Sequence, residues 1–254
     1  MALACALALG VTADVEAAKP ALAIKSRVLV GSVEIDAKLR RYAKLRAFLL
    51  AEGKRGLADV RKQAEELGVD ALGTYKNQPW TDYIVFTLRS TAGPIVSVVR
   101  RDLVDMGGAH PNTQIETTIW DRKAERPLTL SDLFVETTDG GPTLTALAKL
   151  IRDDLAATKR KNDYEVAADP AQDFELKKVV AKITTLGAPS LAPSTVSGKA
   201  SGLTFHFSPY VVGGFADGVY VAFVPAPTIL PLLKPELRSL FGGERPENDA
   251  KEPE

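Results

Sequence analysis

Only two histidines occur in this chain of 254 residues, and His110 and His206 are its best candidates for chemistry. A zinc or iron hydrolase usually needs two or three His or Cys ligands, and the single cysteine, Cys5, lies far from both histidines in the sequence. No His-Glu-x-x-His, Gly-x-Ser-x-Gly or nucleotide-binding glycine motif is present. We therefore expect no cofactor and no metal, and the inventory favours recognition over catalysis.

The segment around His110 reads Gly-Gly-Ala-His-Pro-Asn-Thr over residues 107–113. Adjacent glycines allow positive φ, while Pro111 fixes its own φ and favours an extended residue before it. Asn112 can hydrogen-bond neighbouring backbone where the next strand begins. We expect a rigid polar corner in which His110, Pro111 and Asn112 either contact a ligand or only hold the turn.

A second segment, residues 205–218, reads Phe-His-Phe-Ser-Pro-Tyr-Val-Val-Gly-Gly-Phe-Ala-Asp-Gly. Strand alternation puts the first two Phe on one face and the intervening histidine on the other. The glycine-rich loop that follows carries Tyr210, Gly213 and Phe215, and exposed aromatic rings give large contact area at little entropic cost. These three are candidate binding residues, although aromatic rings that pin the loop to the core would give the same pattern. They would lie near His110 if both loops leave the same edge of a sheet.

Together with Thr-Leu-Ser-Asp-Leu-Phe over residues 129–134, the two segments resemble the RsiV/PdaC-type extracytoplasmic domain. That domain occurs in lysozyme-sensing anti-sigma factors and beside a peptidoglycan deacetylase catalytic domain. The resemblance runs from about Ile24 to Phe241, and it implies an α+β fold and a partner that is either lysozyme or cell-wall glycan. The chain departs from the family pattern at Glu125, where the family has a turn glycine, and at Gly214-Phe215, where it usually has Pro-Tyr.

Two classes of function remain open. The preferred one is an exported, non-catalytic envelope protein that binds lysozyme or peptidoglycan glycan. The alternative is a cell-envelope hydrolase or esterase in which His110 works with Asp105 or Asp132. The metal-binding catalytic domain of the deacetylase has no counterpart in this chain, which is why binding is preferred.

Apolar periodicity predicts an α+β fold with a mainly antiparallel sheet packed against amphipathic helices. Strands are expected within residues 28–33, 83–88, 95–104, 114–120, 203–207 and 219–224. Helices are expected over residues 36–52, with Asp36 as the N-cap and Gly53 after the end, and over residues 57–67, 174–186 and 229–240. A further helix is expected from Pro142 onwards, with one apolar face made of Leu144, Leu147, Ile151 and Leu155. The block over residues 129–134 should plug the core through Leu130, Leu133 and Phe134. The short connections among the strands between residues 83 and 120 favour antiparallel pairing.

Composition and the N-terminal run bear on location. Thirty-two basic residues balance thirty-two acidic ones, so no global field draws the chain to nucleic acid or to an anionic membrane. The apolar run over residues 2–11 has the length of a signal-peptide core and is too short to span a bilayer. We expect residues 1–23 to be a truncated export signal, a periplasmic or extracytoplasmic location, and no transmembrane span. Cys5 is too close to the start for a lipoprotein anchor to be favoured.

The rest of the chain is expected to divide into three parts. Residues 24–106 form a helix-and-strand half that resembles the PdaC-type N-terminal domain, and residues 107–241 form an RsiV-like C-terminal domain. Residues 242–254, GGERPENDAKEPE, have no apolar anchor, so a disordered tail is expected.

Overall fold

The computed structural model describes residues 20–67 and 78–250, and its architecture is α+β, as predicted. Within those ranges six strands form one sheet in the order β1-β2-β3-β4-β5-β6, and three more form a second sheet in the order β7-β8-β9. Neighbouring strands are antiparallel except for β2 and β3, which are parallel. The prediction of mainly antiparallel pairing is confirmed.

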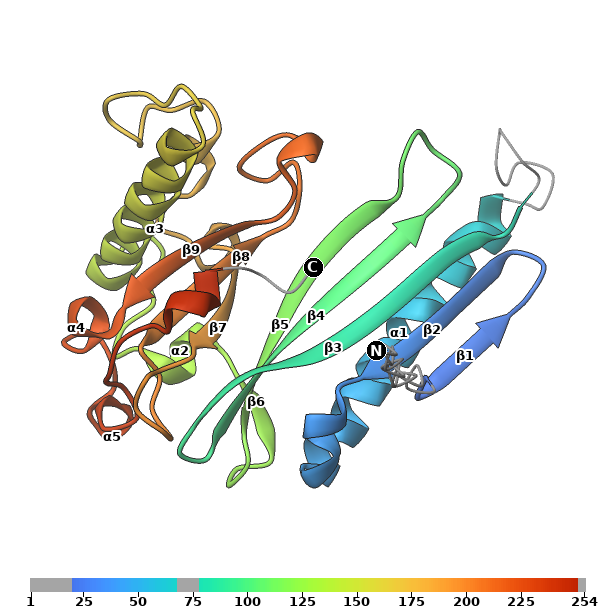
Figure 1. Cartoon of the computed structure of the whole chain (residues 1–254), viewed down its shortest axis with the longest axis horizontal. Coiled ribbons are helices and arrows are strands. Elements are labelled where there is room, and N and C mark those ends of the chain that lie inside the picture. The colour runs from blue at the N-terminus through green and yellow to red at the C-terminus, as the bar shows by residue number, and fades with distance from the viewer. Residues whose placement is uncertain (1–19, 68–77, 251–254) are drawn as a thin grey trace, which may run out of the picture.

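The six-stranded sheet consists of β1 (Leu22–Lys25), β2 (Leu29–Ile35), β3 (Trp80–Ala92), β4 (Ile95–Asp105), β5 (Asn112–Asp121) and β6 (Arg126–Leu128). The three-stranded sheet consists of β7 (Ala188–Ala192), β8 (Gly202–Phe207) and β9 (Tyr220–Pro225). The helices are α1 (Ala43–Leu67), α2 (Leu130–Leu133), α3 (Pro142–Lys161), α4 (Ala226–Ile229) and α5 (Pro235–Arg238). Short 3-10 turns are η1 (Ala37–Arg41), η3 (Leu176–Lys178), η4 (Ile183–Thr185), η5 (Phe215–Asp217) and η6 (Glu247–Ala250). Figure 1 shows α1 along the six-stranded sheet and α3 along the three-stranded sheet, at opposite sides of the view.

A single helix, α1, stands where the sequence predicts two helices separated at Gly53. That prediction is wrong because the glycines of this stretch are not helix ends. Gly53 is buried, and a Cβ at its position would lie 2.7 Å from Cγ1 of Val33 on β2. Gly56 likewise leaves room for the guanidinium of Arg100. The missing side chains let the helix approach the sheet closely, and Asp36, the expected N-cap, caps η1 instead.

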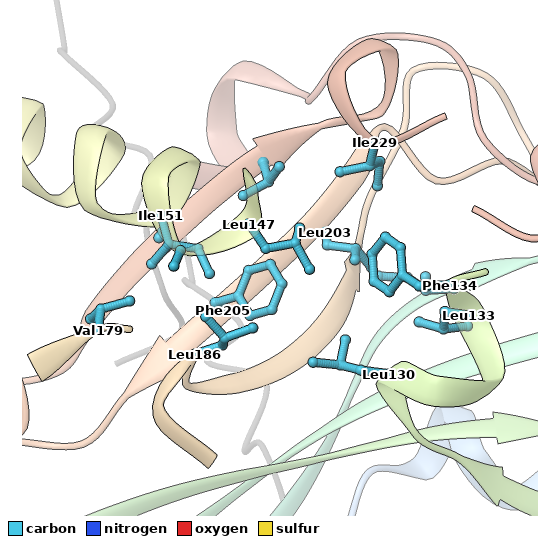
Figure 2. Packing of buried hydrophobic residues seen from close by; sticks show 14 of the residues in the cluster. Leu130, Leu133, Phe134, Leu147, Ile151, Val179, Leu186, Leu203, Phe205 and Ile229 are labelled. Carbon is cyan, nitrogen blue, oxygen red and sulfur yellow. The ribbon is translucent and has the colours of Figure 1, made fainter. Parts of the chain in front are cut away.

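The C-terminal half has its own hydrophobic core between α3 and β8. The predicted apolar face of α3 is confirmed, since its members Leu144, Leu147, Ile151 and Leu155 are all fully buried. Figure 2 shows how Leu147 and Ile151 of α3 lie near Leu203 and Phe205 of β8, with Leu130, Leu133 and Phe134 of the α2 region at one end of the cluster. The block over residues 129–134 is therefore a plug of this core, as its sequence predicts.

Two predicted helices are replaced by shorter elements. Residues 174–186 form the turns η3 and η4, and the β-branched side chains between Val179 and Thr185 disfavour a continuous helix. Residues 229–240 are divided between α4 and α5. Pro231 and Pro235 have no N–H to continue a helix, and Pro235 instead takes the first position of α5.

The tail differs from the predicted disorder between Gly242 and Asp249. The carboxylate of Asp249 accepts hydrogen bonds from Nη2 of Arg89 at 2.7 Å and from Nε of Arg245 at 2.6 Å, and its side chain is only 6% exposed. Arg245 also lies over the ring of Phe223, 4.9 Å from its centroid. Buried ionic contacts thus replace the apolar anchor that the tail lacks. Residues 251–254 lie outside the described residues.

The expected division at residues 106 and 107 falls between β4 and β5, which pair along ten residues of one sheet. The two halves of the chain are also joined where β7 crosses that sheet. The N–H of Leu191 donates to Oγ of Ser97 at 3.0 Å, and its carbonyl accepts the hydroxyl of Ser90 at 2.7 Å.

Of the expected export signal over residues 1–23, residues 1–19 lie outside the described residues, and Leu22 already belongs to β1. Among the described residues, no helix has the length and apolar character needed to cross a bilayer.

Candidate functional site

Two loops that are distant in the sequence meet above the sheets. One connects β4 to β5 and carries His110, and the other connects β8 to β9 and carries Tyr210 and Phe215; both lie at the upper edge of the view in Figure 1. The rings of His110 and Phe215 stack with centroids 3.5 Å apart and planes 17° apart. The ring of Tyr210 lies 5.8 Å from that of Phe215. We name His110, Tyr210 and Phe215 the aromatic cluster, and it is the candidate site.

The β4–β5 turn holds His110 by backbone contacts. Oδ1 of Asp105 accepts the N–H of Gly107 at 2.8 Å, and Gly107 has a φ of +77°, which explains why glycine stands there. Nδ1 of His110 lies 2.9 Å from the carbonyl oxygen of Pro111. A carbonyl can only accept, so Nδ1 carries the proton and Nε2 is free to accept. Nε2 accordingly accepts the hydroxyl of Tyr210 at 3.2 Å.

The loop after β8 is fastened at its start and strained at its tip. Oγ of Ser208 accepts the N–H of Ile115 on β5 at 2.9 Å, and Val212 is fully buried in the C-terminal core. Between them Tyr210 is 56% exposed and has a φ of +71°. Left-handed backbone is unusual for a bulky residue, and such strain persists only where its surroundings impose it. Strained residues cluster at functional sites, which makes this loop a candidate for one.

The other sequence-predicted site residues shape the loops. Gly213 is buried, and a Cβ there would lie 2.4 Å from Cε2 of Tyr220, so this glycine allows close packing and offers no side chain to a ligand. Asn112 begins β5 and pairs with Val104 on β4. Pro111 contributes the carbonyl that orients His110. The structure therefore brings together three of the six predicted residues and gives the remaining three supporting positions.

The hydrolase alternative requires an aspartate on His110, and neither expected aspartate reaches it. Asp105 accepts the N–H of Gly107, as described above. Asp132 accepts a hydrogen bond from Arg126 at 2.7 Å and the backbone N–H of Thr129 at 2.8 Å, and these contacts hold its pKa well below the usual range. Both ring nitrogens of His110 already have partners. In the described residues no three His, Cys, Asp or Glu side chains are grouped so that they could hold a metal ion.

A buried serine–histidine pair was missed by sequence reasoning. Oγ of Ser190 lies 2.8 Å from Nε2 of His206, and the two residues are 0% and 2% exposed. Strand alternation places His206 opposite its two Phe neighbours, but it does not reveal that this face of β8 is also covered. The hydrogen bond gives each of these two buried polar groups a partner. Because both groups are buried, the serine is not accessible to a substrate as a nucleophile.

Charged groups beneath α1 were also missed. Asp82 is 1% exposed and neither of its carboxylate oxygens has a hydrogen-bond partner in the described structure. Burial, together with the nearby Asp102 and against the opposing effect of Arg100, raises the pKa of Asp82 to about 6. Asp102 itself accepts Nε of Arg100 at 2.7 Å. Their signal in the sequence is acidic residues at inward-facing positions of β3 and β4.

No model of a protein family matches this chain, and no curated protein matches it. Among solved structures, a DUF3298 family protein from Pseudomonas aeruginosa is similar, with a TM-score of 0.52, 16% identity, and coverage of 85% of this chain and 88% of that protein. A DUF3298 family member from Bacteroides fragilis has a TM-score of 0.49, 17% identity, and coverage of 82% and 85%. The DUF3298 family is related to the RsiV/PdaC-type domain. The chain thus shares the α+β fold of a DUF3298 family protein.

Proposed function

We propose that this protein is a non-catalytic binding module of the cell envelope that contacts lysozyme or peptidoglycan glycan through the aromatic cluster. The observation that carries the proposal is the convergence of His110, Tyr210 and Phe215 from two loops, with His110 and Tyr210 lying 100 residues apart in the sequence. A cluster assembled from distant segments depends on the whole fold, as a binding site does and a local turn does not.

The state of Tyr210 supports a ligand surface over a structural plug. A residue that only pinned the loop to the core would be buried, whereas Tyr210 is 56% exposed and adopts left-handed backbone. Val212, two residues later, is fully buried and already anchors the loop. The exposed ring therefore adds nothing to the anchoring that Val212 provides, and it suits a partner that offers apolar area. The hydroxyl donates to His110, and its oxygen can still accept a hydrogen bond from a partner.

An envelope location is part of the proposal, and two features of the sequence support it. The apolar run over residues 2–11 resembles a signal-peptide core, and the residues after Cys5 contain no thiol that an oxidising compartment could modify. Cleavage after Ala17 would leave β1 intact, whereas cleavage after Ala23 would remove Leu22 and Ala23 from its four residues. A mature N-terminus before Leu22 would therefore keep β1 complete.

The hydrolase alternative loses support from the geometry of His110. Its Nδ1 faces the carbonyl of Pro111 and its Nε2 faces the hydroxyl of Tyr210, so neither nitrogen is paired with a carboxylate that would stabilise an imidazolium. Binding requires only accessible side chains, and His110 and Tyr210 are both exposed.

The proposal is tested by measuring binding to immobilised lysozyme and co-sedimentation with purified insoluble peptidoglycan. Tyr210→Ala and Phe215→Ala should weaken binding to one of these by about tenfold, the factor that corresponds to about 1.4 kcal/mol. Tyr83→Ala is the matched control, because Tyr83 is 42% exposed on β3 and does not belong to the cluster. Wild-type protein that binds neither probe, or variants that bind as wild type does, would overturn the proposal.

A further inference from the structure

One carboxylate ties the loop of the aromatic cluster to the C-terminal end of α3. Oδ1 of Asp217 accepts the hydroxyl of Tyr164 at 2.5 Å, and Oδ2 of Asp217 accepts the N–H of Gly214 at 2.8 Å. Asp217 closes the turn η5, whose first residue is Phe215. The same side chain therefore shapes the turn that carries the stacked ring and connects that turn to another part of the fold.

Tyr164 is held in place by the way in which α3 ends. The N–H of Asp163 donates to the carbonyl of Arg160 at 3.2 Å, and the N–H of Tyr164 donates to that of Lys159 at 3.0 Å. Asp163 has a φ of +62°. These are the bonds and the left-handed residue of a Schellman motif, with aspartate in place of the usual glycine. Tyr164 is thus presented from a rigid helix end and not from a freely moving loop.

The other side of the loop rests on a second tyrosine and a buried lysine. Gly213 packs against Tyr220, as described above, and Nζ of Lys159 lies 4.7 Å from the centroid of the Tyr220 ring and 5.6 Å from that of Tyr164. Lys159 is only 6% exposed. The hydrogen bonds from Tyr164 and Gly214 lower the pKa of Asp217, in agreement with a carboxylate that is ionised in this setting.

We propose that Tyr164 and Asp217 form a latch that sets the position of the aromatic cluster and thereby controls ligand affinity at the proposed binding site. This inference rests on the proposed function for its biological meaning, but the latch itself is defined without a ligand. Both are positioning residues, since neither belongs to the cluster. With the latch closed, η5 presents the ring of Phe215 to His110; with it open, the turn loses the hydrogen bond that ties it to Tyr164 at the end of α3, and the stack loosens.

The latch can open because it lies at the surface. Tyr164 is 43% exposed, so its hydroxyl exchanges the carboxylate for water without burying an unpaired group. The packing contacts at the core side of the loop, at Val212 and Gly213, do not depend on this hydrogen bond. Opening should therefore displace Phe215 and Tyr210 while leaving β8 and β9 folded.

The test uses the proton NMR signals of the two histidine rings. A ring stacked on Phe215 experiences a strong ring current, so the Hε1 and Hδ2 signals of His110 should be displaced upfield, and Phe215→Ala should remove the displacement. His110→Gln assigns the signals, because the remaining set belongs to the buried His206. In Tyr164→Phe and in Asp217→Asn, the His110 signals should move downfield by at least half of the change in chemical shift seen in Phe215→Ala. Tyr83→Phe, at a tyrosine of similar exposure, should leave them unchanged.

The affinity for lysozyme or peptidoglycan, whichever the wild type binds, should fall about tenfold in Tyr164→Phe with no change in far-UV circular dichroism. His110 signals that match the wild type in both latch variants would overturn the latch, whatever the binding assays give. If the latch variants lose the upfield displacement of the His110 signals but the wild type binds neither probe, the latch stands and the proposed function is overturned. An unchanged affinity in a variant with an open latch would overturn its control of binding.

Discussion

Tyr210 places its hydroxyl oxygen 3.2 Å from Nε2 of His110, although 100 residues separate the two side chains. The carbonyl of Pro111 occupies the other ring nitrogen and so selects the tautomer in which Nε2 accepts. The pair joins a hairpin of the six-stranded sheet to a loop of the three-stranded sheet. A substitution at either residue therefore affects a contact between the two halves of the fold.

Replacing Tyr210 with glycine should separate stability from binding. The φ of +71° is strained for tyrosine and freely allowed for glycine. Relief of that strain should offset the greater flexibility of a glycine in the unfolded chain, so we expect Tyr210→Gly to be at least as stable as the wild type. Binding should fall as in Tyr210→Ala, because the ring is lost in both. Urea denaturation and the binding assay measure the two effects.

Val211→Gly is the matched control for this prediction. Val211 is 43% exposed, lies next to Tyr210, and has no positive φ. Glycine at that position relieves no strain, so it should destabilise the protein by about 0.5–1 kcal/mol. Equal losses of stability in the two glycine variants would show that Tyr210 is not strained in solution.

Asp82 should make stability depend on pH between about 4 and 6. Its pKa is about 6 in the folded protein against an ordinary value of 3.8, so the folded state holds the proton more tightly than the unfolded state. The stability that this provides is fully present below about pH 4 and is lost as the pH rises to about 6. Asp82→Asn keeps the shape without the charge and should be more stable than the wild type at pH 7.

The comparison between wild type and variant isolates Asp82 from the other groups that titrate in this range. The free energies of unfolding from urea titrations at pH 4, 5, 6 and 7 should differ most at pH 7 and converge at pH 4. Arg100 and Asp102 face the same region and remain in both proteins. A difference that stays constant across the four pH values would contradict the raised pKa.

Much of the fold could be predicted from periodicity. The strands β3, β4 and β5, the helix α3 and the plug at residues 129–134 all follow from alternating or three-to-four-residue apolar spacing. The errors have physical causes that single positions do not reveal. Gly53 predicts a helix end because a glycine that ends a helix and one that lets a helix approach a sheet look alike in sequence. Only the nearby Val33 distinguishes them.

The candidate site was predictable in part for a different reason. Loop composition indicated Tyr210, Phe215 and His110, since glycines and aromatic rings outside regular elements are visible in the sequence. The sequence does not indicate the latch, because Tyr164 and Asp217 lie 53 residues apart and neither residue on its own differs from an ordinary polar loop residue. Glu125, which stands where the family that the sequence resembles has glycine, does adopt a positive φ of 52°, as a residue forced into that turn must.

Gly53→Ala tests the close approach of α1 to the sheet. Alanine favours a helix by up to about 1 kcal/mol over glycine, so propensity alone predicts a more stable protein. The new Cβ would lie 2.7 Å from Cγ1 of Val33, however, and overpacking of this kind costs about 1–3 kcal/mol. We expect a net loss of stability in urea denaturation. Val33→Ala removes the obstructing methyl groups, so the double variant should be more stable than the sum of the single effects predicts.

Asp249→Asn tests whether the C-terminal tail is part of the folded protein. Its carboxylate is 6% exposed and accepts from Arg89, whose side chain is 14% exposed, and from Arg245. Asparagine removes the negative charge that balances both guanidinium groups, so we expect a loss of about 3 kcal/mol, in the range for breaking a buried pair. Glu65→Gln is the control, since its pair with Arg61 is more than half exposed on both sides and should change stability by less than about 0.5 kcal/mol. Equal, small effects in both variants would show that residues 242–250 do not hold the two sheets together in solution.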